Sequence, residues 1–223
     1  MGSYEATIDM LEAELTAVLQ VLGELSAQEW HLPTKLVPVD PALPRWTVFE
    51  LAGHFDISIG LTRMLISGRE ASQPGRDRTS FFINPRSETA PVVYGYAYTM
   101  VEGKTPADMP QVLGETFAKA VQEARAVPAE TVGPGYFAPM RVDEFVASRM
   151  VEAVVHGIDL TQALGRDTIA TPDGIAITAA ILDDLLARRT VAGRPAQLAD
   201  DLDWILAASG RAESADTRLP LIG

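Results

Sequence analysis

The feature that most constrains the fold is a series of long segments whose apolar residues recur every three or four positions. The first covers about residues 4–25, with Ile8, Leu11, Leu15, Val18, Leu19 and Leu22 at this spacing. The pattern places apolar side chains on one face of an α-helix, and that face must be buried against other elements. Further helices are predicted at about residues 48–66, 107–126, 142–164, 172–189 and 196–209. We therefore predict an all-α fold.

Residues at the predicted helix ends support these boundaries. Thr47 followed by Glu50 forms a capping box, which is typical of the first turn of a helix. Gly68 and Gly165 follow two of the predicted helices, where glycine commonly ends a helix. Prolines prevent a regular helix between the first two, at Pro33, Pro38, Pro41 and Pro44.

The segments between the helices are less well defined. Residues 69–90 are polar and predict a long loop, and residues 128–141 predict a Gly/Pro-rich connection. In residues 92–101, Tyr94, Tyr96 and Tyr98 occupy every second position, as in a β-strand, although a short helix is also compatible with this segment. From about residue 211 the chain is expected to be loose. Four long helices and two short ones predict a four-helix bundle over residues 1–165, with a C-terminal helical extension over residues 166–223 that packs on the bundle.

Composition excludes several classes of function. The net charge of −12 argues against nucleic acid or an anionic membrane as the main partner, because phosphates repel such a surface. No stretch approaches the roughly 20 apolar residues of a membrane span, and no signal peptide is evident, so we predict a cytoplasmic protein. The chain has no cysteine, which excludes disulfides, thiolate metal ligands and a cysteine nucleophile.

The chain has three histidines, and His54 has the most informative position. Its helix carries an apolar stripe made of Leu51, Ile57, Ser58, Leu61 and Leu65, and His54 lies on that stripe. The side chain should therefore face the core. Its role is either that of a core histidine hydrogen-bonded to a carbonyl or that of a metal ligand. We assign no function to His31.

A second pair of candidate ligands is found on the helix over residues 142–164. Glu152 and His156 are four residues apart, so both side chains project from one helix face and can reach the same ion. The alternative is a buried Glu–His pair, or a pair between Glu152 and Arg149. With His54 these residues supply two imidazoles and one carboxylate, which leaves open coordination positions as in catalytic sites. Zinc is the first choice, and nickel, cobalt, manganese and iron(II) are also compatible with these ligands.

Two charged neighbours on the same helix are candidates for the chemistry. Arg149 shares the face of Glu152 and His156, where it could orient Glu152, bind an anionic substrate group or form a structural ion pair. Asp159 lies three residues after His156 and could hold its imidazole through a hydrogen bond. The alternative for Asp159 is a solvent-facing carboxylate near the helix end.

Two motifs resemble those of a known superfamily. The segments Pro44-Arg45-Trp46-Thr47-Val48 and Leu51-Ala52-Gly53-His54 are similar to one signature of the DinB/mycothiol-dependent maleylpyruvate isomerase superfamily. The segment from Glu152 to Leu160, EAVVHGIDL, with Ala163-Leu164-Gly165 after it, is similar to its second signature. The resemblance covers about residues 1–165 and includes the isomerase N-terminal domain family.

The resemblance implies a DinB-like four-helix bundle with a divalent metal on His54, Glu152 and His156. It also implies a thiol-dependent isomerase or S-transferase that uses mycothiol or a similar thiol on a small electrophilic substrate. Because the family's isomerases carry a further C-terminal domain, of which this chain is expected to hold a shortened version, a general thiol transferase is favoured. The alternatives are a metal-dependent hydrolase and a non-catalytic metal-binding or stress protein. A homodimer is also compatible with the sequence.

Overall fold

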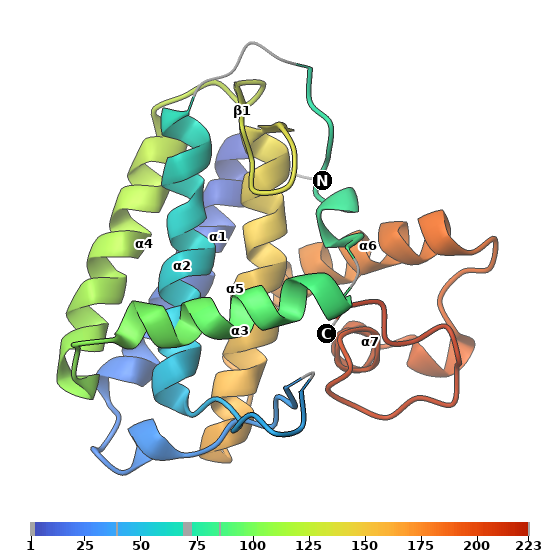
Figure 1. The fold of residues 1–223 in the computed structure, drawn as a ribbon. Helices are drawn as coiled ribbons and strands as arrows, with labels where there is room; N and C mark the ends of the chain where they lie inside the picture. Colours follow the sequence, from blue (N-terminus) through green and yellow to red (C-terminus); the bar gives the residue numbers. More distant parts are fainter. Residues whose placement is uncertain (1–2, 39, 69–72, 85, 223) are drawn as a thin grey trace.

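The computed structural model describes residues 3–38, 40–68, 73–84 and 86–222. It confirms the all-α prediction, with a four-helix bundle and additional C-terminal helices (Figure 1). The helices are α1 (Tyr4–Gly23), α2 (Val48–Ser67), α3 (Arg86–Val101), α4 (Met109–Arg125), α5 (Val142–Leu164), α6 (Pro172–Arg189) and α7 (Asp201–Ala208). Four 3-10 turns are also present in the described residues, η1 (Glu29–His31), η2 (Ser80–Phe82), η3 (Pro106–Asp108) and η4 (Ala196–Leu198).

Helices α1, α2, α4 and α5 form the bundle, because each of α1 and α2 packs against both α4 and α5. They run side by side, and α3 crosses them and packs on α2 (Figure 1). The core is apolar at its centre, with Ile8, Leu15, Phe55, Ile59, Leu113, Phe145 and Val154 almost fully buried. Burying these faces is what makes the amphipathic helices stable together.

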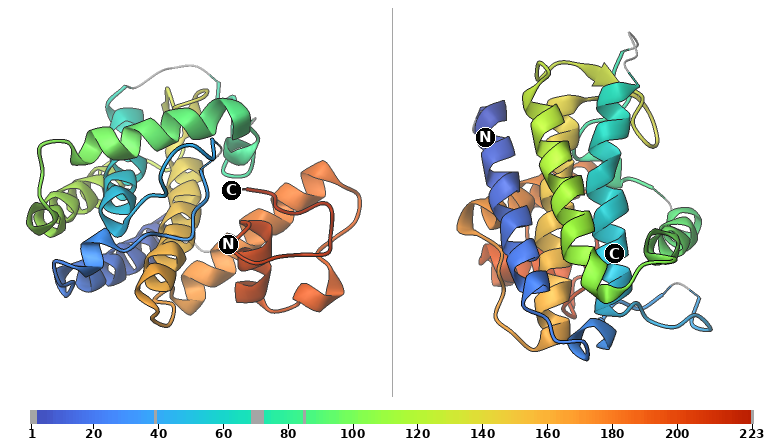
Figure 2. Two further views of the ribbon diagram at one scale, coloured as in Figure 1. Left: turned by 60° about the horizontal axis from the view of Figure 1, so that its bottom comes forward. Right: turned by 90° about the vertical axis from the view of Figure 1, so that its left-hand side faces the viewer.

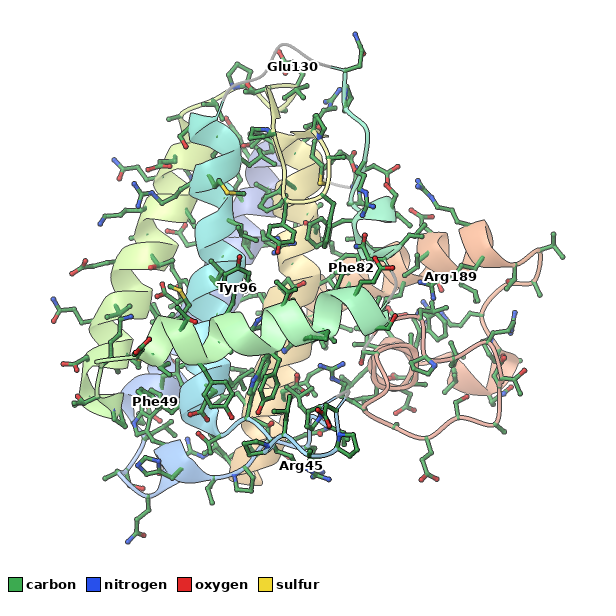
Figure 3. The ribbon with its side chains drawn as sticks, in the orientation of Figure 1. Arg45, Phe49, Phe82, Tyr96, Glu130 and Arg189 are labelled. Carbon is green, nitrogen blue, oxygen red and sulfur yellow. The ribbon has the colours of Figure 1, made fainter. Side chains whose placement is uncertain are left out.

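The C-terminal helices lie to one side of the bundle (Figure 2). Helix α6 packs against α5 and α1, and α7 packs against α6 around the fully buried Trp204. Arg189, labelled in Figure 3, donates a 2.8 Å hydrogen bond to the carbonyl of Leu221 and so ties α6 to the C-terminal loop. The division into two domains stays a prediction.

The predicted boundaries of α2 and α5 agree closely with the structure. The capping box of α2 is formed, since Glu50 accepts a 2.8 Å hydrogen bond from the Thr47 amide and the Thr47 hydroxyl accepts one from the Phe49 amide. Gly165 ends α5 in the left-handed conformation, with φ of 64°.

The structure decides one open assignment and corrects or refines the other expectations about the connections. Of the two alternatives for residues 92–101 it shows the helix, since they belong to α3. Helix α3 begins at Arg86, inside the expected loop, of which residues 69–72 and 85 lie outside the described residues. The connection 128–141 contains an antiparallel pair, β1 (Val132–Gly133) and β2 (Met140–Arg141). The segment 196–209 is divided into η4 and α7. The chain after residue 211 is packed, because Leu221 is buried and its amide bonds the Ala208 carbonyl.

A buried glutamate joins the bundle to the C-terminal extension and should make the stability of the protein depend on pH. Glu14 of α1 is 2% exposed and accepts hydrogen bonds from the amide, at 2.7 Å, and from the hydroxyl of Thr171, which caps α6. Burial raises the pKa of Glu14, and the bonds from Thr171 only partly oppose this. Because its pKa is higher in the folded than in the unfolded protein, Glu14 stabilises the fold in its protonated form. This stabilisation is fully present below the ordinary pKa of a glutamate and is lost as the pH rises through the raised pKa.

Glu14→Gln keeps both hydrogen bonds without the charge. We expect its free energy of unfolding to match that of the wild type near pH 4 and to exceed it by on the order of 1 kcal/mol at pH 7, because the buried charge is removed. Urea unfolding at a series of pH values measures this, with the exposed Glu5→Gln as control. A difference between the Glu14→Gln variant and the wild type that stays constant with pH would contradict the raised pKa.

Candidate metal centre

The three predicted ligands come together in the bundle, from α2 and α5. Glu152 is central, with one oxygen, Oε2, 3.3 Å from Nε2 of His54 and 3.3 Å from Nε2 of His156. The ligand atoms of all three residues lie within 4.8 Å of one another. Their side chains are 8%, 15% and 13% exposed for His54, Glu152 and His156. The site is therefore inside the protein but close to its surface.

These distances fit a metal ion. Donor atoms bound to one tetrahedral zinc ion at about 2.0–2.1 Å lie about 3.3–3.4 Å from each other. The two separations of 3.3 Å, between each imidazole nitrogen and Glu152 Oε2, match this spacing. Two neutral nitrogens and one carboxylate also form a donor set that zinc and related divalent metals accept.

Electrostatics around the triad favour an ionised carboxylate. Although burial raises the pKa of Glu152, its hydrogen bonds to His156 and His54 and the charge of Arg149 lower it well below the usual value. Burial and the neighbouring His156 lower the pKa of His54, which favours the neutral imidazole that binds metals. Burial lowers the pKa of His156 as well, but hydrogen bonds to Asp159 and Glu152 outweigh it, so that the pKa is raised.

Asp159 lies directly behind His156. Its Oδ2 is 2.8 Å from Nδ1 of His156, and the residue is 1% exposed, so the alternative of a solvent-facing carboxylate is wrong. Burial raises the pKa of Asp159, but Arg211 and His156 lower it to about 2. An ionised carboxylate can only accept, so the imidazole Nδ1 carries a hydrogen for Asp159, and Nε2 is the ring nitrogen left for a metal ion. This is the arrangement that metal-binding histidines use.

Arg149 is buried beneath the site rather than exposed in it. Arg149 is 1% exposed. It donates hydrogen bonds to the carbonyl of Ser58 at 3.0 Å and to the hydroxyl of Ser148. Its guanidinium lies over the rings of Phe81 and Phe145, at 4.6 and 4.5 Å from their centroids. Its hydrogen bonds join α5 to α2. This burial argues against a direct contact between Arg149 and a substrate, and its charge acts on Glu152 through space.

An aromatic cluster covers the other side of His54. Trp46 stacks on the His54 ring, with centroids 5.2 Å apart and planes at 29°, and Tyr94 of α3 stacks on Trp46 at 6.0 Å. The Tyr94 hydroxyl donates to the Pro44 carbonyl at 2.7 Å and can accept a hydrogen bond from the Tyr98 hydroxyl, 3.1 Å away. By contrast Tyr96, labelled on α3 in Figure 3, is 42% exposed. Residues 94 and 98 therefore line one helix face.

Two residues of this surround were missed by sequence reasoning. Trp46 lies within the Pro44–Val48 segment that carries the family resemblance, so a signal for it was present. Arg211 contacts Asp159 from a segment expected to be loose, and nothing in its local sequence indicated the contact.

Comparison with known proteins agrees with the fold and the motifs. The family model for the mycothiol maleylpyruvate isomerase N-terminal domain matches residues 11–161, which is more than half of the chain. The chain belongs to this family. Its two candidate ligand segments, around His54 and around Glu152 and His156, both lie inside the matched region. No curated protein matches the sequence.

A solved structure supports the fold independently of the motifs. The chain is similar to the crystal structure of the mycothiol-dependent maleylpyruvate isomerase, with a TM-score of 0.55 and 15% sequence identity. The match covers 83% of this chain and 70% of that one, so it extends beyond the four-helix bundle. In the described residues, no helix is long and apolar enough to cross a membrane.

Proposed function

We propose that this family member is a metal-dependent enzyme that uses a thiol cosubstrate of the mycothiol type to transfer or isomerise a small electrophilic molecule. His54, Glu152 and His156 would hold one divalent ion, with zinc as the first choice. The observation that carries the proposal is the convergence of the three ligand atoms within 4.8 Å of one another, with two of the separations, at 3.3 Å, equal to the spacing of donor atoms on a tetrahedral zinc ion. Membership of a family described by mycothiol and maleylpyruvate supports the thiol and the class of substrate.

The thiol must come from outside the chain. The sequence has no cysteine, so no side chain can supply a sulfur nucleophile. A divalent ion with an open position binds a thiol and lowers its pKa, which produces the reactive thiolate. Three protein ligands leave at least one position of a tetrahedral ion for this purpose.

The residues around the triad have supporting roles in this proposal. Asp159 accepts the Nδ1 hydrogen of His156, which would leave Nε2 for the ion, and Arg149 favours the ionised form of Glu152. Trp46 covers one face of the His54 ring and keeps water from it. The cytoplasmic location, the homodimer and the absence of nucleic-acid partners stay predictions from the sequence.

The decisive experiment measures metal and thiol dependence together. Protein purified without a histidine tag is analysed for metal, and the zinc-loaded and metal-free forms are then assayed with maleylpyruvate and mycothiol. An isomerase converts the substrate without consuming thiol, whereas a transferase consumes one thiol for each product. Both outcomes require the metal and support the proposal.

Two other outcomes would overturn it. Turnover that needs the metal but no thiol would indicate a hydrolase, with water as the nucleophile. Protein that binds no divalent metal, or binds it without thiol-dependent turnover of maleylpyruvate or of simple electrophiles such as chlorodinitrobenzene, would indicate a binding protein.

A further inference from the structure

The C-terminal extension reaches the metal centre through the side chain of Arg211. This residue donates from Nε to Oδ1 of Asp159 at 3.0 Å and from Nη2 to Oδ2 at 2.8 Å, and Oδ2 is 2.8 Å from Nδ1 of His156. We propose that Arg211 is a positioning residue for His156, which acts through Asp159 and makes the affinity for metal depend on the docked C-terminal segment. The inference rests on the proposed function, because it assumes that His156 binds the metal.

The contact between Arg211 and Asp159 is suited to fixing an orientation. Two parallel hydrogen bonds from a guanidinium to a carboxylate hold the plane of the carboxylate, which a single bond does not. Their side chains are 8% and 1% exposed, so water competes little for these bonds. Asp159 therefore presents Oδ2 to His156 in one direction.

Backbone structure fixes Arg211 in turn. The Gly210 amide bonds the Ala207 carbonyl at 3.2 Å and the Arg211 amide bonds the Leu206 carbonyl at 2.7 Å, a pair of bonds that ends α7 in a Schellman motif. Gly210 has φ of 75°, in the left-handed region that favours glycine. This turn directs the chain back toward α5, and Arg211 follows it immediately.

The order of contacts explains how a distant segment can influence the metal. Without the guanidinium, the Asp159 carboxylate loses the two bonds that fix its plane. The imidazole of His156 then loses a stationary acceptor for its Nδ1 hydrogen, so Nε2 is less firmly directed at the ion. Replacement of the groups that orient metal-bound histidines typically weakens binding by about 10- to 100-fold. Because Arg211 acts one step further away, we expect the lower end of this range.

The test is the zinc dissociation constant of the full chain, measured by competition with a chromophoric chelator. We expect Arg211→Ala to weaken binding about tenfold and Arg211→Lys to weaken it less, because lysine keeps the charge but not the paired bonds. If Arg211 acts through Asp159, adding Arg211→Ala to Asp159→Asn should cause no further loss. If Arg211 had only a structural role, the losses caused by Arg211→Ala and Asp159→Asn would add to each other.

A matched control is available in the same extension. Arg194 pairs with Asp183 and Asp201 and has a comparable position between α6 and α7, but it does not contact Asp159. Arg194→Ala removes ion pairs of the same kind from the extension without removing the contact between Arg211 and Asp159, and should leave the zinc affinity unchanged. Equal losses in the Arg194 and Arg211 variants would overturn the inference, since the loss of any ion pair in the extension would then weaken binding and the contact with Asp159 would have no special role.

Three further cases are distinguished by these variants. If Arg211→Ala does not fold, Arg211→Lys, which keeps the charge but not the paired bonds, is compared with the wild type, and an unchanged zinc affinity in this variant would overturn the inference. If His156→Ala abolishes zinc binding but Arg211→Ala binds like the wild type, the inference fails and the proposed function stands. If His156→Ala still binds zinc, the proposed function fails first, and the role of Arg211 with it.

Discussion

Replacement of His156 by alanine is expected to remove stoichiometric metal binding and with it any metal-dependent turnover. Structural zinc sites with four protein ligands bind with about 10–16 kcal/mol, or roughly 3–4 kcal/mol for each ligand. Loss of one ligand of three should therefore weaken binding roughly 100- to 1000-fold. His54→Ala and Glu152→Ala are expected to have effects of the same order, because each removes one of the donor atoms that converge within 4.8 Å.

Metal analysis after dialysis, with zinc titration of the metal-free protein, measures this expectation. His31→Ala is the matched control, since His31 is the remaining histidine and is exposed on η1. Circular dichroism should show that all four variants keep their helices, because each substitution lies at the edge of a core of many other apolar side chains. Full metal content in the three triad variants would mean that the ion binds elsewhere in the protein.

Much of this site could be predicted because it is built from regular helices. Glu152 and His156 lie on one face of α5 by helical spacing alone, and the apolar stripe of α2 placed His54 toward the same interior. The spacing of Asp159 from His156 allowed either a hydrogen bond or a solvent-facing carboxylate, and the structure shows the bond at 2.8 Å. Contacts of this kind follow from the spacing of residues along one helix, which can be read from the sequence alone.

The parts that were missed depend on contacts between distant segments. Arg211 and Asp159 are 52 positions apart, and their pairing follows from the docking of α6 and α7 and not from any local pattern. Helix α3 packs one face on the bundle, with Ala97 and Val101 buried, but apolar residues such as Val92 and Tyr96 are exposed on its other side, so its sequence shows no clear helical periodicity, and Pro91 lies inside it. Its alternating tyrosines therefore resembled a strand. The docking of α6 and α7 and the crossing of α3 depend on tertiary packing, which the spacing of apolar residues along the sequence does not reveal.

The crossing of α2 and α3 depends on one glycine next to the candidate metal ligand. A Cβ atom added at Gly53 would lie 2.4 Å from the carbonyl oxygen of Ala97 and 2.8 Å from Cγ1 of Val101. The first of these contacts is with backbone, so it can be relieved only by moving α3. Gly53→Ala is therefore expected to lower the free energy of unfolding by about 1–3 kcal/mol, the usual range for overpacking.

Gly60→Ala, seven residues further along α2, is the control for the intrinsic effect of the substitution. Its added Cβ would meet only Cγ2 of Thr116, at 3.6 Å, which is an ordinary contact. Because alanine is the better helix former, we expect this variant to be more stable than the wild type by about 0.5–1 kcal/mol. Urea unfolding followed by circular dichroism compares the two.

A shift of α3 would also reach the metal centre. Tyr94 of α3 stacks on Trp46, and Trp46 stacks on His54, so moving the helix disturbs the cover over one imidazole. Gly53→Ala should then weaken zinc binding as well as stability, while Gly60→Ala should leave the zinc affinity unchanged. An equal gain in stability in both variants would contradict this prediction. It would mean that α3 accommodates the added methyl group at Gly53 without strain, and that the close approach of α2 and α3 does not hold Tyr94 and Trp46 against His54.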